Sequence, residues 1–563
     1  MSFSDILEKV GSVGKFQIIH TLLLVLPIIF LASHNLLQNF VAVVPNHHCQ
    51  IYLETNGTRY VNITGKFQAE KFLQVFIPLD KNRQLEQCLT YSSPQWHLLD
   101  LNETQQNRTE YNTQVCSHGW TYDSSMFKAT IVTEWDLVCS SKSLRQMTQS
   151  IYMAGVLAGS IILGRLSDRF GRRTLLLWSH FQMAVSGTCG AFSSSYPLFC
   201  FWRFLCGMAV SGVMLNNNCL SIEWIPTKVR TAVSSYFNYS YTFGQLLLAG
   251  IAYGIQDWRW LQFAVTVPFY VFFLYSWWFP ESARWLILND KADLALKQLK
   301  RVAKLNGKEE EGEKLTTAIL KSNMKKELSN TKETYSVLDL FKTPIMCKTT
   351  CCSMLIWFSM GFAYYGLAID LQGFGVDIYL IQIIFGAVDI PAKFVAVITL
   401  IYVGRRFTQG TSLILAGSII ILNIFIPKEL KALRTSFAAV GKGCLASAFS
   451  CSFLYAGELY PTVVRQTGLG LVTTMARIGA VVAPVVQLTG DYIAFLPMAI
   501  YGGVAIISGV TAFLLPETLN IPIPDTIEEV ESRAKKGVEK DKERKKDEVP
   551  LQGTDTSLME QSI

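Results

Sequence analysis

Long apolar stretches alternate with short polar segments along almost the whole chain. Each stretch holds about 20 residues, the length that an α-helix needs to cross the hydrocarbon core of a bilayer. The pattern predicts twelve membrane helices, over residues 16–40, 146–166, 174–194, 196–220, 231–254, 259–279, 346–369, 376–400, 408–427, 432–456, 467–488 and 494–515. The first stretch is too long for the apolar region of a signal peptide, so we expect it to remain a helix. The chain is therefore predicted to be an all-α membrane protein.

Sequence repeats divide the predicted helices into two halves. Residues 223–230 spell E-x-x-P-T-x-V-R, and residues 458–465 spell the same pattern. Two further repeats are G-R-R at 171–173 and 404–406, and P-E-[ST] at 280–282 and 516–518. Duplicated halves are typical of secondary transporters, which bind their substrate between the halves near the bilayer midplane. The repeats predict two pseudo-symmetric bundles of six helices each.

Charged loops orient these helices in the membrane. The short loops after the second, fourth, eighth and tenth helices carry arginine or lysine, from four basic residues in or beside the first of these loops to Arg465 alone in the last. The positive-inside rule places them, and with them both termini, in the cytosol. The predicted division is a cytoplasmic N-terminus (1–15), an N-terminal half (16–280) with an extracellular loop (41–145), an intracellular helical linker (281–345), a C-terminal half (346–516) and a cytoplasmic tail (517–563).

The segment 41–145 carries independent marks of an extracellular location. It holds four N-x-[ST] glycosylation motifs, at Asn56, Asn62, Asn102 and Asn107. It also holds four of the 13 cysteines, Cys49, Cys88, Cys116 and Cys139. Cysteines gathered in an extracellular segment indicate disulfides, so we expect two bonds, with three connectivities left open.

Composition excludes several classes of protein. Half of the residues are apolar, 17% are charged and the mean hydropathy is +0.28, which is incompatible with a soluble domain of this size. The net charge of +7 comes from cytoplasmic loops and the tail, so no nucleic-acid partner is expected. The chain has no nucleophile elbow, zinc-spaced His/Glu set or phosphate loop. We therefore expect no enzyme activity, no metal site and no cofactor.

The loop between the second and third helices carries the motif G-x-x-x-D-R-x-G-R-R. Its residues are Gly164, Asp168, Arg169, Gly171, Arg172 and Arg173. Its glycines are expected to permit a tight turn, and Asp168 is expected to cap a helix N-terminus and pair with a cation across the interface between the halves. A latch of this kind favours one access state of the carrier. The repeated acidic and basic residues Glu223, Arg230, Glu458 and Arg465 are assigned to the same latch.

Three cations lie deep in predicted helices of the C-terminal half: Arg477, Lys393 and Lys442. An unpaired cation at the bilayer centre costs roughly 3 kcal/mol, so each is expected to meet a partner or a water-filled cavity. Asp389 could pair with Lys393, one turn away on the same helix, or with Lys442 on another helix. The second pairing leaves Arg477 and Lys393 for an anionic substrate. Arg477 is the stronger candidate because a guanidinium stays charged when desolvated and binds carboxylates through two hydrogen bonds.

The repeat indicates how charge is distributed around such a site. The positions about 235 residues before Arg477 and Lys393 are Thr242 and Ala158, so the N-terminal half has no matching cations. A cavity between the halves would then be positive on its C-terminal wall and neutral on the other.

Several motifs are similar to those of a known transporter family. The G-x-x-x-D-R-x-G-R-R loop, R-F-L-x-G at 203–207 and P-E-S-A-R-W at 280–285 resemble the major facilitator superfamily. A narrower resemblance rests on A-S-H-N-L-L-Q-N-F at 32–40, H-H-C at 47–49, F-A-Y-Y-G at 362–366, I-F-G-A-V-D-I-P-A-K at 384–393 and G-E-L-Y-P-T at 457–462. These motifs resemble the organic anion transporter branch of the organic ion transporter family, and most of all its kidney-type basolateral organic anion/dicarboxylate exchangers.

The resemblance implies a major facilitator fold and a set of site residues. The candidate substrate contacts are Arg477, Lys393, Tyr241, Tyr364, Tyr365, Phe449, Phe453, Trp357, Asn35 and Asn39. It favours the Asp389–Lys442 pairing as a structural ion pair.

The function that the resemblance implies is a plasma-membrane antiporter of epithelial cells. It would import amphipathic organic anions, such as carboxylates, sulfate esters, drugs and urate, in exchange for an intracellular dicarboxylate such as 2-oxoglutarate. We expect it to work by alternating access as a monomer in the lipid bilayer, with chloride as a candidate ion for the anion site. The alternative is an organic cation or zwitterion carrier on the same fold, which would be expected to have a carboxylate in place of Arg477.

Overall fold

The structure is a computed structural model of the whole chain. It describes residues 3–11, 13–51, 54–55, 58–59, 72–80, 84–96, 112–226, 229–322, 336–369, 371–427, 429–461, 463–521, 524 and 526–533.

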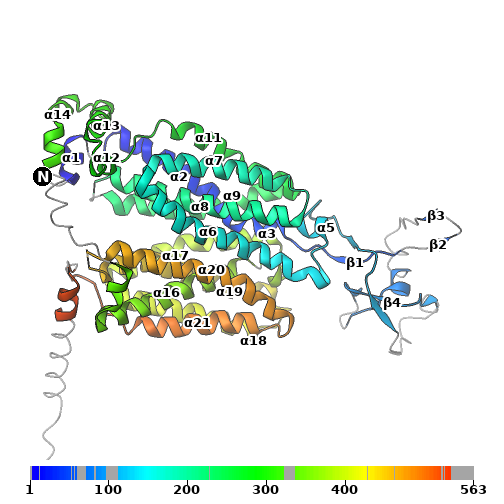
Figure 1. The fold of residues 1–563 in the computed structure, drawn as a ribbon. Helices are drawn as coiled ribbons and strands as arrows, with labels where there is room; N and C mark the ends of the chain where they lie inside the picture. Colours follow the sequence, from blue (N-terminus) through cyan, green and yellow to red (C-terminus); the bar gives the residue numbers. More distant parts are fainter. Residues whose placement is uncertain are drawn as a thin grey trace, which may run out of the picture.

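Two helical bundles lie side by side (Figure 1). The N-terminal half contains α2 (Lys15–Leu36), α6 (Lys142–Phe170), α7 (Arg172–Ala191), α8 (Tyr196–Trp224), α9 (Arg230–Gly254), α10 (Trp258–Thr266) and α11 (Pro268–Ser276). The C-terminal half contains α16 (Pro344–Ala368), α17 (Ile378–Tyr402), α18 (Arg405–Phe425), α19 (Lys431–Leu459), α20 (Arg465–Gln487) and α21 (Leu496–Ala512). Eight helices in the described part of the chain are long and apolar enough to span a membrane. The predicted fold class is confirmed.

Each predicted apolar stretch corresponds to observed helix, with two differences. The stretch 259–279 is two helices, α10 and α11, because Pro268 at the start of α11 has no N–H to continue the hydrogen bonding of α10. The first stretch continues beyond α2 into the short helix α3 (Gln38–Val41). We call the end of the bundles that carries residues 41–145 the outer end and the opposite end the inner end.

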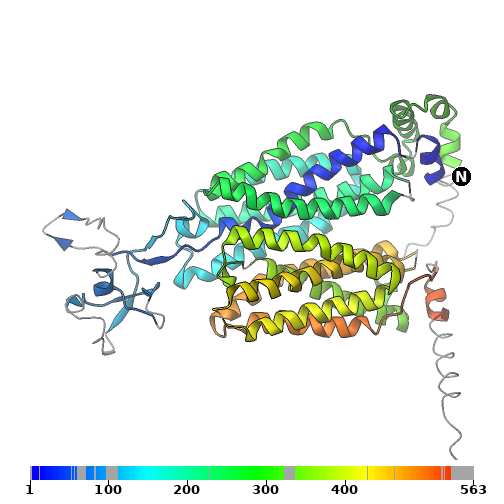
Figure 2. The ribbon, with the colours of Figure 1, turned by 180° about the vertical axis from the view of Figure 1, so that it is seen from behind.

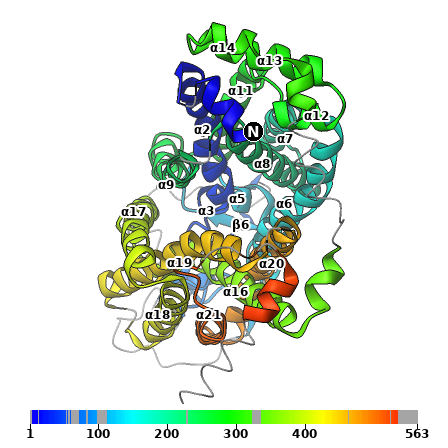
Figure 3. The same cartoon turned by 90° about the vertical axis from the view of Figure 1, so that its left-hand side faces the viewer.

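The halves meet along two pairs of helices. Helix α6 packs against α20, and α9 packs against α17. The α9–α17 contact lies on the side of the molecule seen in Figure 2, and the view in Figure 3 along the helices shows the two halves facing each other. Polar contacts join the halves at the outer end, where the Asn39 side chain donates to the carbonyl of Ala368 over 2.9 Å, and in the middle, as described below.

The internal repeat extends to helix packing within each half. A Cβ atom on Gly244 of α9 would lie 2.0 Å from the carbonyl oxygen of Ile29, and one on Gly479 of α20 would lie 2.3 Å from that of Phe358. Both glycines thus let the fifth helix of a half touch the backbone of the first. Because these glycines stand 235 residues apart, the duplication is preserved in atomic contacts as well as in motifs.

The outer end carries a small disulfide-bonded unit. Short strands pair as β1 (His47–Cys49) with β6 (Trp120–Tyr122), β4 (Leu89–Tyr91) with β5 (Thr113–Val115) and β2 (Glu54–Thr55) with β3 (Thr58–Arg59), and α5 (Ile131–Trp135) and η2 (Cys139–Ser141) lead into α6. Of the three connectivities left open by the sequence, the structure has Cys49–Cys116 and Cys88–Cys139. The four predicted glycosylation sites, Asn56, Asn62, Asn102 and Asn107, lie outside the described residues.

Short helices cover the inner end. They are α1 (Phe3–Lys9), α12 (Ala283–Leu288), α13 (Ala292–Leu305) and α14 (Glu309–Glu313), with the 3₁₀ helix η4 (Val337–Phe341) before α16; the 3₁₀ helices η5 (Leu371–Phe374) and η6 (Leu488–Asp491) lie at the outer end. Asn306 joins the chain N-terminus to this group, because its side chain accepts from the N–H of Phe16 and donates to the carbonyl of Val10.

Candidate functional site

Arg477 lies on α20, in the helix pair that joins the two halves. Its side chain is half-buried, and among the described residues no carboxylate forms an ion pair with it. Tyr365 of α16 is close enough to interact with it electrostatically. A cation in this position that lacks a protein counter-charge remains available for an anion.

Aromatic side chains from α16 and α19 continue from Tyr365 along the site. The rings of Tyr364 and Tyr365 are 5.5 Å apart, and Phe449 meets Tyr364 edge-on at 5.5 Å. Two helical turns away on α16, Trp357 packs edge-on against Phe453, with their ring centres 4.7 Å apart. Phe453 is 51% exposed, whereas Trp357 is buried beneath it. The structure thus brings the predicted aromatic residues of α16 and α19 together, whereas Tyr241 lies on α9.

Asp389 and Lys442 form a buried ion pair within the C-terminal half. Their side chains are each 1% exposed, and Lys442 Nζ lies 2.9 Å from Asp389 Oδ1. Lys442 also donates to the carbonyl of Phe385 over 2.8 Å. Gln245 of α9, in the other half, completes the pair by donating to Asp389 Oδ2 over 3.2 Å and accepting from Lys442 over 3.2 Å. The intrahelical alternative, Asp389 with Lys393, is not the observed arrangement.

Lys393 reaches across the interface to the N-terminal half. Its Nζ donates to the Thr242 hydroxyl over 2.7 Å and to the carbonyl of Asn238 over 2.9 Å, both on α9. Its two acceptors are uncharged, so its positive charge is not cancelled by them. Lys393 is therefore engaged with the neutral wall rather than standing free, and Thr242, the repeat counterpart of Arg477, is one of the groups that hold it.

The two predicted asparagines have different surroundings. Asn35 accepts from the Tyr152 hydroxyl over 2.7 Å and donates to the Tyr241 hydroxyl over 3.2 Å. Asn39 donates to the carbonyl of Ala368 and, over 3.3 Å, to the side chain of Gln382. Asn35 thus belongs to the aromatic group around Arg477, while Asn39 joins the halves at the outer end.

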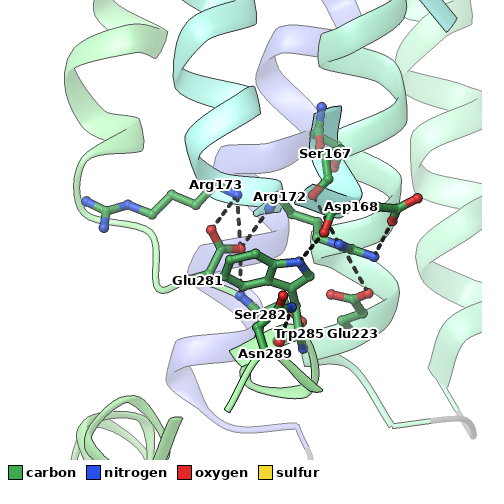
Figure 4. Close-up of polar contacts among 10 residues, drawn as sticks. Ser167, Asp168, Arg172, Arg173, Glu223, Glu281, Ser282, Trp285 and Asn289 are labelled. Carbon is green, nitrogen blue, oxygen red and sulfur yellow. Dashed lines mark hydrogen bonds and ion pairs between the residues drawn. The ribbon is translucent and has the colours of Figure 1, made fainter. Parts of the chain in front are cut away.

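The latch motif folds around Glu281, a carboxylate of the repeated P-E-[ST] motif that was not among the predicted latch residues (Figure 4). Glu281 accepts from the backbone N–H groups of Arg172 and Arg173, at 2.9 and 3.1 Å, at the start of α7. A carboxylate in this position satisfies free N–H groups and interacts favourably with the helix dipole. Gly171 has φ +99°, and a Cβ atom there would lie 2.4 Å from Glu281. Only glycine therefore allows this cap to form.

The predicted role of Asp168 is wrong in two respects. Asp168 does not cap α7, and its partner is Arg172 of the same half, at 2.9 Å, rather than a cation across the interface. Its carboxylate is 77% exposed, so this ion pair is weak. Arg172 also lies 3.5 Å from Glu223, and the Trp285 indole donates to the carbonyl of Asp168. Figure 4 shows these groups gathered at one helix junction.

Other members of the predicted latch lie at the same junction with separate contacts. Gly164 is inside α6 rather than in the turn. Arg173 donates to the carbonyl of Trp277 over 2.6 Å, and Arg169 lies over the ring of Phe170. Arg230 donates to the carbonyl of Ile225, which ends α8.

The C-terminal half repeats the latch closely. Glu517 accepts from the N–H groups of Arg405 and Arg406, and Gly404 has φ +115°. Arg405 binds Glu458 through two hydrogen bonds of 3.0 Å, and Arg465 donates to the carbonyl that ends α19, as its counterpart does in the first half. Each half therefore carries its own charged cluster at the inner end. The repeated P-E-[ST] motif was the sequence signal for Glu281 and Glu517, whereas Gln245 had only its place on a polar helix face.

Comparison with known proteins places this geometry in a family. The family profile "Sugar (and other) transporter" matches residues 91–530. Solute carrier family 22 member 6-A of Xenopus laevis is 55% identical over 536 residues, 95% of each chain. Organic anion transporter 3 of Oryctolagus cuniculus is 48% identical over 98% of each chain, and solute carrier family 22 member 20 of Mus musculus is 47% identical over the full length of both.

A solved structure shares the fold. The xylose transporter XylE of E. coli, in an inward open conformation, matches with a TM-score of 0.55 and 19% identity, over 70% of this chain and 90% of that one. The protein is thus a multi-pass membrane transporter and not an enzyme. The chain belongs to solute carrier family 22, in the organic anion transporter branch, within the major facilitator superfamily.

Proposed function

We propose that this protein imports amphipathic organic anions, including carboxylates, sulfate esters, anionic drugs and urate, by alternating access. The observation that carries the proposal is Arg477, a cation with no carboxylate partner among the described residues, which lies beside Tyr365 and the aromatic group of α16 and α19. A guanidinium binds a carboxylate or sulfate, while the rings receive the apolar part of the same molecule. The names of relatives at about half identity, such as organic anion transporter 3, support this substrate class.

The driving force is exchange for an intracellular dicarboxylate such as 2-oxoglutarate. An anion at the interface neutralises Arg477 and the uncancelled charge of Lys393, so a loaded carrier changes its access state at lower cost than an empty one. Tight coupling of this kind favours exchange over uniport. Chloride is a candidate for the same site when no organic anion is bound.

The cellular setting follows from the same proposal. The protein works as a monomer in the plasma membrane, on the basolateral side of epithelial cells, with both termini in the cytosol and the loop 41–145 glycosylated outside. Through the Gln245–Asp389 and Lys393–Thr242 contacts a single chain supplies both walls of the proposed site, which supports the proposal of a functional monomer.

Uptake by the Arg477→Ala variant tests the substrate class. Cells that display the variant at normal surface density are expected to lose most p-aminohippurate uptake, while Arg477→Lys keeps part of it because a cation remains. Unchanged uptake by Arg477→Ala would refute the proposal. Uptake of tetraethylammonium by cells that display the unmodified protein, above that of cells without it, would favour an organic cation carrier instead.

Counterflow tests the exchange. Cells or proteoliposomes preloaded with 2-oxoglutarate should take up p-aminohippurate several times faster than unloaded ones, and preloaded label should leave in parallel. Equal uptake with and without internal dicarboxylate would remove the exchange step but leave the substrate class in place.

A further inference from the structure

A second guanidinium is buried within the N-terminal half, away from the proposed anion site. Arg203 of α8 is 1% exposed, and in the described part of the chain its three guanidinium nitrogens have no hydrogen-bond acceptor. Its close neighbour is the ring of Tyr152 on α6, whose centre lies 4.2 Å from the guanidinium carbon. Arginine stays charged in such surroundings, and the face of a phenol ring attracts it. A buried cation held mainly by one ring is costly, which points to a use beyond packing.

Tyr152 begins a line of side chains that crosses to the other half. Its hydroxyl is bonded to Asn35 Oδ1 over 2.7 Å, and Asn35 Nδ2 is bonded to the Tyr241 hydroxyl over 3.2 Å. The Tyr241 hydroxyl lies near that of Tyr365, and Tyr365 lies near Arg477. Four elements therefore connect the cation of one half with the cation of the other.

The chemistry of these groups gives the line a direction. An amide oxygen only accepts, so Tyr152 must donate its proton to Asn35. An amide nitrogen only donates, so the Tyr241 oxygen accepts from Asn35 and keeps its own proton for the next group. Tyr241 can then donate to Tyr365, which leaves the Tyr365 proton for a ligand beside Arg477. Aligned hydrogen bonds polarise one another, and the charge of Arg203 over the first ring strengthens Tyr152 as a donor.

We propose that Arg203 and Tyr152 are positioning residues for the anion site, aligning a line of donors through Asn35 and Tyr241 so that the Tyr365 hydroxyl donates to the bound anion. The inference rests on the proposed function, because it assigns the anion to Arg477. It adds a second contact to the anion and gives a role to a buried guanidinium that has no hydrogen-bond acceptor among the described residues.

Replacing Tyr152 by phenylalanine tests the line at its first bond. Tyr152→Phe keeps the ring over Arg203 but removes the proton that orients Asn35. The KM for p-aminohippurate is expected to rise about fivefold, the effect of one hydrogen bond, with the maximal rate per surface transporter within about twofold of the unmodified protein. Arg203→Leu should raise KM in the same direction, and Arg203→Lys, which keeps a cation over the ring, should restore part of the affinity.

A matched control separates positioning from loss of stability. The Tyr275 hydroxyl, also in the N-terminal half, donates to the carbonyl of Leu23 over 2.6 Å and is outside the line. Tyr275→Phe should therefore leave KM unchanged. If Tyr152→Phe reaches the cell surface poorly, binding can be measured in detergent extracts as thermal stabilisation by p-aminohippurate. The concentration that gives half of the maximal stabilisation should still rise about fivefold in this variant.

Each outcome assigns failure to one proposal. An unchanged KM in Tyr152→Phe, or an equal rise in Tyr275→Phe, would overturn the positioning role even if Arg477→Ala abolishes uptake. A rise in KM for Tyr152→Phe together with normal uptake by Arg477→Ala would instead overturn the placement of the anion.

Discussion

The buried pair of Asp389 and Lys442 allows a quantitative test of the C-terminal half. Replacing Lys442 with methionine keeps the volume of the side chain but removes the cation 2.9 Å from Asp389. The remaining carboxylate keeps a donor in Gln245, at 3.2 Å, and stays 1% exposed. Removing one partner of such a pair costs about 3–5 kcal/mol, because the other charge remains desolvated.

The double variant should recover most of this loss. With Asp389→Asn added, no charge is left, and the amide can both accept from Gln245 and donate to its oxygen. The remaining deficit is the carbonyl of Phe385, which loses the donor at 2.8 Å and costs about 1–2 kcal/mol. The double variant is thus expected to be about 2–3 kcal/mol more stable than Lys442→Met alone.

The stabilities of these variants can be compared by the temperature at which each aggregates in detergent, together with its abundance at the cell surface. Lys442→Met should aggregate several degrees below the unmodified protein, and the double variant should lie between the two. As a control, Lys304→Met removes an exposed pair with Glu309, whose side chains are 71% and 60% exposed, and should change little. A Lys442→Met variant as stable as the unmodified protein, or a double variant less stable than both single variants, would refute the reasoning.

Three further predictions concern the latch, the interface and the outer loop. Gly171→Ala should destabilise the protein by about 1–3 kcal/mol, because the φ of Gly171 is +99° and a Cβ atom there would displace the carboxylate that caps α7. The control Gly164→Ala should be tolerated, since its Cβ atom would lie 3.4 Å from the nearest neighbour. Equal melting temperatures of the two variants would contradict this prediction. Lys393→Met should lower anion uptake but keep the free energy of unfolding within about 1 kcal/mol of the unmodified protein, because both groups that Lys393 binds are neutral. A parallel loss of stability and uptake would instead indicate a purely structural role. Joint replacement of Cys88 and Cys139 by serine removes a crosslink across 51 residues and should lower the stability of the disulfide-bonded outer unit by about 4 kcal/mol. The measurement is the rate of proteolysis of this unit in intact cells, which should increase. An unchanged rate would contradict the prediction.

The fold was predictable because the bilayer limits the choices. Every apolar stretch became helix, since a backbone in lipid must satisfy its own hydrogen bonds, and the repeats located the boundary between the halves. The break at Pro268 followed from local chemistry that a hydropathy window averages out.

The site was predictable only where charge made a residue conspicuous. Arg477 drew attention as a cation in an apolar helix, and it indeed has no carboxylate partner among the described residues. Which of two lysines Asp389 would meet depended on helix rotation, and the contribution of Gln245 depended on packing between the halves, neither of which a sequence pattern encodes. Asp168 misled because its motif places it beside the α7 N-terminus, while the cap itself comes from Glu281, more than 100 residues later.

The amide of Gln245 has a mechanical consequence. Gln245 belongs to α9, yet it forms hydrogen bonds with both Asp389 and Lys442, which belong to the C-terminal half. Lys393 of α17 forms a second connection to α9 through Thr242. A movement that separated α9 from α17 would leave the buried Asp389 carboxylate and Lys442 ammonium without the hydrogen bonds of Gln245. A tilt of the two halves about the α9–α17 contact would preserve these hydrogen bonds. We therefore expect the α9–α17 contact to stay closed during transport, with the largest displacements at the two ends of the bundles.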